Sequence, residues 1–232
     1  MTPAEAEAER ILAEYKRRDA EIGRDFYSLT RSANLFAWQG QQRALLQALA
    51  RSNALPLHDQ RILDVGCGRG QWLGMLEDFG ASRGNFSGTD LNAGRIQEAQ
   101  TNFPGADLRV GDATKLPWPD ATFDLVLQAT MFTSILDDTV RVAIATEMRR
   151  VVKKTGLIVW YDFRINNPRN PNVRGISKKE LERLFLGCSI QLELVTLAPP
   201  IARRIVPRAF LVATALERIR ILNTHYFGVI RT

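Results

Sequence analysis

The sequence contains little cysteine and little histidine. Its 232 residues include two Cys and two His, and neither Cys67 nor Cys188 has a Cys or His partner at metal-ligand spacing. No uncharged apolar run approaches the roughly 20 residues that a membrane span needs. The acidic, alanine-rich N-terminus also lacks the pattern of a signal peptide. We therefore expect a cytoplasmic protein without disulfides, without a metal site and without a transmembrane helix.

The composition is ordinary for one globular domain, but the charge is unevenly distributed. Hydrophobic residues make up 45% of the chain and charged residues 24%, with a formal net charge of +6. Residues 201–232 hold six Arg against Glu217 alone. Such an excess can steer an anionic substrate or favour an anionic membrane surface, and solvated helix faces are the open alternative. Nucleic-acid binding is not favoured, because no basic stripe is interleaved with aromatic residues.

The chain is organised around residues 61–73, where a short apolar run changes abruptly into a glycine-rich turn. A buried parallel strand is indicated over residues 62–65, and a helical pattern resumes at Trp72. Alternate glycines allow positive φ and let a ligand approach the backbone, while the first N–H groups of the helix point at it. These glycines are Gly66, Gly68 and Gly70. The pattern predicts a site for a small polar ligand.

Three carboxylates accompany three successive predicted strands. Asp90 ends the second strand, where an open α/β sheet places the acceptor for the two hydroxyls of a ribose. Asp112 follows the third strand, and Asp64 lies in the first. The order G-C-G-R-G differs from the G-x-G-x-x-G of a dinucleotide site, and Arg69, the one basic residue of the turn, is expected to point outward. The set favours a cationic nucleoside without phosphate.

These residues resemble the class I S-adenosylmethionine-dependent methyltransferases, which have a seven-strand Rossmann-like sheet. The resemblance covers residues 57–165, in the stretches ILDVGCGRG, FSGTDLN, VGDATKLPWPDATFDLVLQA and EMRRVVKKTGLIVWYDF. It implies that the glycine turn holds the amino-acid part of the cofactor, Asp90 the ribose, and Asp112 with the Ala113 amide the adenine edge. The cofactor-binding positions that it implies are Asp64, Gly66, Cys67, Gly68, Asp90, Leu91, Asp112, Ala113 and Gln128.

The remaining pattern predicts a three-layer α/β fold over residues 57–232. Predicted strands and helices alternate as in successive βαβ units. The sheet is expected to have seven strands, mostly parallel, with an antiparallel last strand between the fifth and sixth as in the family. The predicted strands are 62–65, 86–90, 108–110, 123–127, 157–161, 190–197 and 224–231. The predicted helices are 3–22, 34–49, 71–79, 93–101, 137–152 with Gly156 as its stop, 178–186, and 201–222 with a break at Pro207.

Residues 1–56 are predicted to form a helical lid segment. In many members of the family an N-terminal segment of this kind folds over the cofactor. Tyr27 and Arg31 are therefore candidates to line the substrate site, and packing in the core is the alternative for the aromatic ring.

The acceptor is expected at residues 162–174, directly after the fifth predicted strand. This stretch contains four Asn, three Arg, two Pro and one Asp, so it predicts an irregular loop whose ordering requires that its polar groups be used. A surface turn is the alternative. Asp162 is the predicted catalytic carboxylate, and His225 is the competing base. The predicted substrate-binding side chains of the loop are Arg164, Asn167 and Arg174.

The predicted activity is methyl transfer from S-adenosylmethionine to an oxygen of a small polar or sugar-like acceptor, without a metal. No Asn/Asp-Pro-Pro-aromatic motif follows the fourth strand, which argues against nucleobase N-methylation. The 162–174 loop and the Thr-His-Tyr ending look like small bacterial methyltransferases of polysaccharide or secondary-metabolite pathways. The alternative is a protein that keeps the cofactor pocket but acts as a non-catalytic binding or regulatory partner. Residues 201–222 are predicted to contact an anionic membrane or a partner, and the oligomeric state is open.

Overall fold

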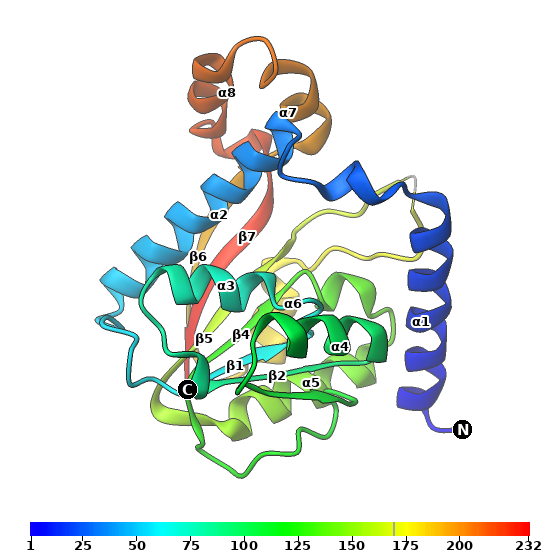
Figure 1. The fold of residues 1–232 in the computed structure, drawn as a ribbon, viewed down its shortest axis with the longest axis vertical. Helices are drawn as coiled ribbons and strands as arrows, with labels where there is room; N and C mark the ends of the chain where they lie inside the picture. Colours follow the sequence, from blue (N-terminus) through cyan, green and yellow to red (C-terminus); the bar gives the residue numbers. More distant parts are fainter. Residues whose placement is uncertain (169) are drawn as a thin grey trace.

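A seven-stranded sheet forms the centre of the molecule (Figure 1). The computed structural model describes residues 1–168 and 170–232, so Arg169 of the predicted 162–174 loop lies outside the described residues. The strand order is β3-β2-β1-β4-β5-β7-β6, with β7 antiparallel to both of its neighbours. This confirms the predicted topology. The strands are β1 (Ile62–Val65), β2 (Phe86–Asp90), β3 (Asp107–Val110), β4 (Phe123–Ala129), β5 (Val152–Phe163), β6 (Ser189–Leu197) and β7 (Asn223–Arg231).

Helices cover both faces of this sheet. They are α1 (Pro3–Glu21), α2 (Ser32–Arg51), α3 (Gln71–Asp78), α4 (Ala93–Asn102), α5 (Asp138–Val151), α6 (Lys178–Leu184), α7 (Pro199–Ile205) and α8 (Phe210–Glu217). Successive strand residues point to opposite faces, and Ile62 and Leu63 accordingly belong to two different core clusters. The first cluster includes side chains of α2, α3 and α4, and the second includes side chains of α5 and α6. The result is the predicted three-layer arrangement.

The N-terminal segment divides into two parts with different roles. Leu45 and Leu49 of α2 are fully buried in the first core cluster, so α2 belongs to a core layer rather than to a lid. Helix α1 stands apart from α2 along one side of the molecule and contacts α5 (Figure 1). Of the predicted lid segment, only α1 therefore lies over the carboxyl ends of the strands. Within the residues that the structure describes, no helix combines the length and the apolar character needed to cross a membrane.

Two predicted boundaries were wrong. Helix α5 ends at Val151, and Gly156 lies inside β5 instead of stopping the helix. The pairing of β4 with β5 changes register here, and a Cβ on Gly156 would lie 2.8 Å from the carbonyl oxygen of Asp124. Gly156 thus allows close approach of two strands at an irregularity. The predicted break at Pro207 separates α7 from α8 as expected, but α7 begins at Pro199 rather than at residue 201, and α8 ends at Glu217.

Candidate cofactor and acceptor site

The turn between β1 and α3 has the backbone that its glycines predict. Gly66, Gly68 and Gly70 have φ values of +76°, +54° and +81°. A Cβ on Gly66 would lie 2.8 Å from the side chain of Met131, and one on Gly70 would lie 2.6 Å from the ring of Phe103. A Cβ on Gly68 would meet no atom within 4 Å. The turn is therefore packed on two sides and open at Gly68, where a ligand can approach the main chain.

Two buried carboxylates lie beside this turn. The Asp90 carboxylate accepts hydrogen bonds from the backbone N–H of Gly68 at 3.0 Å and of Asn92 at 2.8 Å. Asp64 is 2% exposed, and burial together with the Asp90 charge raises the pKa of its carboxyl well above the ordinary value. Within the described residues no basic side chain forms an ion pair with either carboxylate. The pair is therefore suited to stabilise a positively charged ligand.

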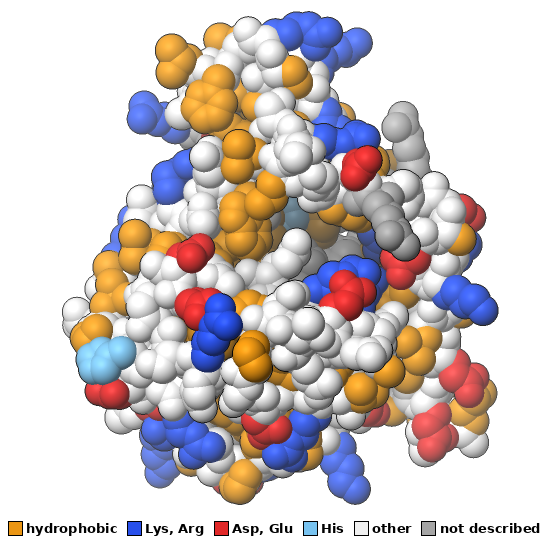
Figure 2. Space-filling view, in the orientation of Figure 1, with side chains coloured by type: hydrophobic (Ala, Val, Ile, Leu, Met, Phe, Trp, Pro, Cys, Tyr) orange, Lys and Arg blue, Asp and Glu red, His pale blue; other side chains and the backbone are white. Residues whose placement is uncertain are grey.

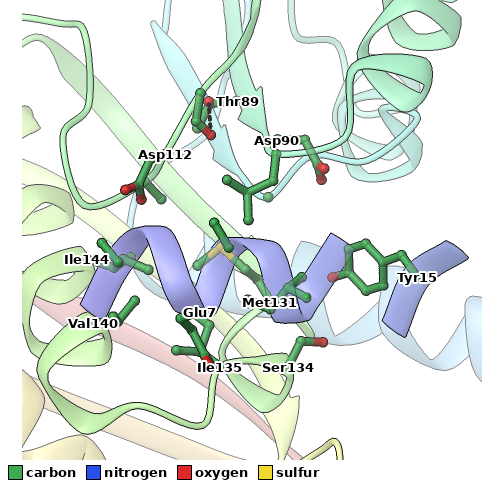
Figure 3. A pocket seen from close by; sticks show the side chains of 17 residues that line it. Glu7, Tyr15, Thr89, Asp90, Asp112, Met131, Ser134, Ile135, Val140 and Ile144 are labelled. Atoms are coloured by element: carbon green, nitrogen blue, oxygen red, sulfur yellow. Dashed lines mark hydrogen bonds between the residues drawn. The ribbon is translucent and has the colours of Figure 1, made fainter. Parts of the chain in front are cut away.

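A cavity with about 520 Å³ of empty space, part of it open to solvent, lies between this edge of the sheet and α1. Figure 3 shows Asp90 and Asp112 on the sheet side, Val140, Ile144 and Ile135 on the other side, and α1 crossing between them. From the sheet come Gly66, Thr89, Asp90, Leu91, Gly111, Asp112 and Ala113; from α1 come Ala4, Glu7, Ala8, Ile11 and Tyr15; and the remaining wall is Met131, Ser134, Ile135, Val140 and Ile144. A mostly apolar lining with carboxylates on one wall is typical of a small-molecule site.

Helix α1 is fixed over the cavity at two points. Near its start the Glu7 carboxylate accepts hydrogen bonds from the backbone N–H of Leu136 and of Asp137, the latter at 3.4 Å. Further along, the Arg95 guanidinium of α4 lies 4.1 Å from the centroid of the Tyr15 ring. These contacts connect α1 to the segments on both sides of the pocket, so they hold it as a cover.

A second polar cluster lies at the same edge of the sheet, around Tyr161 of β5. Its hydroxyl accepts a hydrogen bond from Gln41 Nε2 at 3.0 Å and lies 2.9 Å from the hydroxyl of Thr196. The ring of Trp72, two residues beyond the glycine turn, lies 5.4 Å from the Tyr161 ring. The imidazole of His225, on β7, also stacks on the Tyr161 ring. Tyr161, Gln41, Thr196 and His225 are called the Tyr161 cluster below.

Two residues with strained backbone lie at the Tyr161 cluster, one of them a member of it. Thr130 and Thr196 have φ values of +57° and +66°, and a β-branched residue rarely adopts this region. The Thr130 N–H donates to the Tyr161 carbonyl at 2.7 Å, which helps to hold the strained turn after β4. Strain of this kind is commonly kept at functional sites, where the surrounding structure supports it.

The family described as "Methyltransferase domain" matches residues 62–156. This segment is therefore similar to the domains of that family. It contains the glycine turn, Asp90 and Asp112, so the resemblance that these residues carry is confirmed for this part of the chain.

Known relatives match part of the chain in sequence and more of it in fold. A demethylmenaquinone methyltransferase from Bacillus licheniformis is 33% identical over 100 residues, 42% of this chain and 42% of that protein. The chain spans 43%, 42% and 40% of the length of three of the curated relatives that it matches, and 58% and 60% of two others.

Two solved structures show the extent of the shared fold. A protein from Pyrococcus horikoshii OT3 aligns with a TM-score of 0.59 at 20% identity, over 84% of this chain and 90% of that one. Phosphoethanolamine N-methyltransferase 1 from Haemonchus contortus, in complex with phosphoethanolamine and S-adenosylhomocysteine, aligns with a TM-score of 0.66 at 14% identity, over 100% of this chain and 50% of that one. At these identities the likeness concerns the fold.

The segment that matches the family brings most of the predicted cofactor positions together. Gly66, Asp90, Leu91, Asp112 and Ala113 line the cavity, and Gly68 and Asp64 lie beside it in the turn and the first strand. Cys67 and Gln128 have packing roles instead. The Cys67 thiol packs against Gly88 so closely that a Cβ on Gly88 would lie 3.0 Å from the sulfur. Gln128 is fully buried; its side chain accepts a hydrogen bond from the Met131 N–H and donates one to the Tyr161 carbonyl.

The cavity wall from α1 was not predicted residue by residue. Tyr27 is 56% exposed and its hydroxyl accepts from Arg18, while the Arg31 guanidinium lies 5.9 Å from the centroid of the Phe26 ring. Neither lines the cavity. The residues of α1 that do line it include Ile11 and Tyr15, four positions apart and so on one face of the helix.

The predicted acceptor loop uses its polar groups internally. Asp162 is fully buried, and its carboxylate accepts from the Thr133 hydroxyl, the Thr133 N–H at 3.2 Å and the Phe163 N–H at 2.8 Å. Arg174 pairs with Asp138 and, at 3.0 Å, with Glu180.

Two further loop residues were predicted to bind substrate. Arg164 Nε donates to the Asn223 carbonyl at 2.9 Å, and Asn167 lies in the same loop. The contacts of Asp162, Arg164 and Arg174 order the loop, and none of these three side chains lines the cavity, so their acceptor roles stay predictions.

Proposed function

We propose that this protein transfers a methyl group from S-adenosylmethionine to an oxygen of a small polar or sugar-like acceptor. The observation that carries the proposal is the cavity under α1 in the methyltransferase domain, with Asp90 and Asp112 on its wall. The Tyr161 cluster beside it supplies a place for the acceptor.

The residues present fit the cofactor part by part. Leu91 and Ala113 offer apolar contact for an adenine ring, and Asp90 can accept from ribose hydroxyls. Asp64 and the open side of Gly68 suit the amino-acid end, because two carboxylates without an ion-pair partner favour a cation. When bound, S-adenosylmethionine supplies an electrophilic methyl group on a sulfonium.

The protein's contribution to such a displacement is positioning. Binding holds the acceptor in line with the methyl group, so the loss of translational and rotational freedom is already paid before the reaction. This positioning can supply most of the rate enhancement. Gln41, Tyr161 and Thr196 offer hydrogen-bonding groups near the glycine turn, and the rings of Trp72 and Tyr161 offer flat faces. Hydroxyl groups on a sugar-like body match both kinds of contact.

His225 is the proposed partner of the acceptor hydroxyl. Burial lowers the pKa of its imidazole to about 3, so the ring stays neutral at working pH. Nδ1 lies 3.0 Å from the Thr224 hydroxyl, which donates to the Thr196 carbonyl at 3.5 Å. In that tautomer Nδ1–H donates to Thr224, and Nε2 keeps a lone pair that can orient the acceptor hydroxyl. The acceptor proton becomes strongly acidic as its oxygen gains the methyl group, so a weak base suffices to receive it.

The test has two steps, binding and transfer. Titration calorimetry with S-adenosylmethionine and S-adenosylhomocysteine should give binding that Asp90→Ala weakens and that the exposed control Asp59→Ala leaves unchanged. Transfer of a deuterated methyl group is then followed by mass spectrometry on hydroxylated acceptors, with demethylmenaquinone and phosphoethanolamine included because they appear in the names of the relatives. Binding without transfer to any acceptor would favour the non-catalytic alternative, and no binding would refute both.

A further inference from the structure

Residues 199–221 form a projecting lobe with unusual surface chemistry, which we call the basic lobe. It consists of α7, α8 and the segments that follow them, and it rises from one end of the molecule (Figure 1). Figure 2 shows hydrophobic and basic side chains gathered on this part. Leu211 is 81% exposed and Ile221 is 78% exposed, and the other exposed large apolar side chains of the lobe are Phe210, Val212 and Ile219.

The internal packing of the lobe does not need these exposed side chains. A small core cluster of Phe36, Leu197, Ala202, Val206 and Ala213 joins the lobe to α2 and β6. Leu211 and Ile221 lie outside that cluster. Because several strongly exposed large apolar side chains gathered on one small lobe are uncommon on a monomer without a partner, they indicate a docking surface.

The charge of the lobe selects the kind of partner. Its exposed basic residues are Arg203, Arg204, Arg208, Arg218 and Arg220. Its one acidic residue is Glu217, so five Arg minus one Glu leave a net charge of +4. Glu217 is itself paired with Arg43 of α2 at 3.1 Å, and within the described residues none of the five Arg has an acidic partner. The partner must therefore be apolar and anionic at once.

We propose that the basic lobe docks on the surface of an anionic lipid membrane. Leu211 and Ile221 enter the boundary between headgroups and acyl chains, while the Arg side chains meet lipid phosphates. Aliphatic side chains are poor stacking platforms for nucleic acid bases. A second copy of the chain would bring two surfaces of +4 together, which electrostatic repulsion disfavours.

Docking would place the Tyr161 cluster next to the membrane. The lobe is inserted in the chain between Thr196 and His225, two members of that cluster. The face of the molecule is hollowed between the lobe and the body below it (Figure 2). The acceptor would then be presented at the bilayer surface, and this last consequence rests on the proposed function, whereas docking itself does not.

The experiment measures co-sedimentation of the full chain with vesicles in the absence of cofactor. Vesicles of phosphatidylcholine with about one-third phosphatidylglycerol should bind the protein, and vesicles of phosphatidylcholine alone should bind it at least tenfold less. The double variant Arg203→Gln/Arg204→Gln should lose about fivefold per Arg, which corresponds to about 1 kcal/mol each. Arg149→Gln, a change at an exposed Arg of α5, is the charge control and should bind as wild type.

The apolar contribution is tested with Leu211→Ser/Ile221→Ser, which should lose at least tenfold. Its control is Leu186→Ser, because Leu186 is 75% exposed but lies outside the lobe. Circular dichroism verifies the fold of each variant. The proposal would be overturned by equal binding to both vesicle types or by lobe variants that bind like the wild type. It would also be overturned if the protein formed a dimer without lipid and Leu211→Ser/Ile221→Ser abolished that dimer. Failure of vesicle binding alongside normal calorimetry would leave the proposed function intact.

Discussion

The imidazole of His225 lies parallel to the ring of Tyr161, with centroids 4.7 Å apart and an interplanar angle of 3°. On its other side the centroid of Phe163 is 3.8 Å away. The imidazole is therefore enclosed by aromatic rings, and burial keeps it neutral by lowering its pKa to about 3. Its packing fixes the direction of its two nitrogens, which is what a hydrogen-bonding role toward an acceptor requires.

His225→Phe should separate that role from packing. Phenylalanine keeps an aromatic ring between Tyr161 and Phe163 but removes both nitrogens. We expect kcat for methyl transfer to fall at least tenfold, a barrier increase of about 1.4 kcal/mol, while calorimetry shows unchanged cofactor affinity. Tyr226→Phe, at the next position of β7, is the control and should keep wild-type turnover. Normal turnover by His225→Phe would remove His225 from the acceptor site.

Helix α1 should contribute to cofactor affinity through one face. Ile11 is 6% exposed and lines the cavity, whereas the adjacent Leu12 is 38% exposed and does not. Because each buried methylene contributes about 0.8 kcal/mol, Ile11→Ala should weaken binding of S-adenosylhomocysteine at least about fourfold in calorimetry, the equivalent of one methylene of lost contact. Leu12→Ala is the matched control on the same helix. Equal affinities for the two variants would show that α1 does not cover the bound cofactor.

Asp90 and Asp112 should differ in their contributions to cofactor binding. Asp90→Ala removes the proposed acceptor of two ribose hydroxyls and should cost about 1.5–3 kcal/mol of binding free energy. Asp112→Ala should cost less, because the Asp112 carboxylate is already bonded to the Thr114 N–H at 2.8 Å and hydroxyl at 2.7 Å, and a backbone amide can still hold the adenine. The reverse ranking in calorimetry would contradict the assignment of the ribose to Asp90.

Local patterns were sufficient to predict the sheet and the glycine turn. The apolar run before Gly66 and the acids at the strand ends are signals contained within a few residues, and the strand order follows from the βαβ pattern with the family's antiparallel finish. The irregularity at Gly156 was not predictable in this way. A glycine after a helix and a glycine in a bulged strand look alike until the position of the Asp124 carbonyl in the neighbouring strand is known.

The internal contacts of the predicted acceptor loop were not predictable because its partners lie far away in sequence. Arg141 is fully buried and donates to the carbonyls of Phe132, Ile135 and Arg174. Glu180 lies in the first turn of α6, and its carboxylate pairs with Arg141 and Arg174. A count of polar residues in one segment cannot distinguish groups used for a substrate from groups used to hold three segments together.

The buried Asp162 should also give the protein a distinct dependence of stability on pH. Burial raises the pKa of its carboxyl from 3.8 to about 7, against the opposing effect of hydrogen bonds from Phe163 and Thr133. Between about pH 4 and pH 7 the native state therefore holds a proton that the unfolded chain releases. The contribution of Asp162 to stability is complete below about pH 4 and is lost as the pH rises through 7.

Asp162→Asn removes this titration and should change the slope of stability against pH. Relative to the variant, the wild type should lose about 1.4 kcal/mol of unfolding free energy per pH unit between about pH 4 and pH 7, and the difference should level off above that range. The amide also changes the hydrogen bonds to Thr133, but that offset does not depend on pH. Urea unfolding measured across this range gives both curves, with the exposed Asp59→Asn as the control that should run parallel to the wild type. Parallel curves for Asp162→Asn as well would mean that Asp162 is ionised in the folded protein, so that the contacts of its carboxylate with Thr133 and Phe163 outweigh the effect of burial.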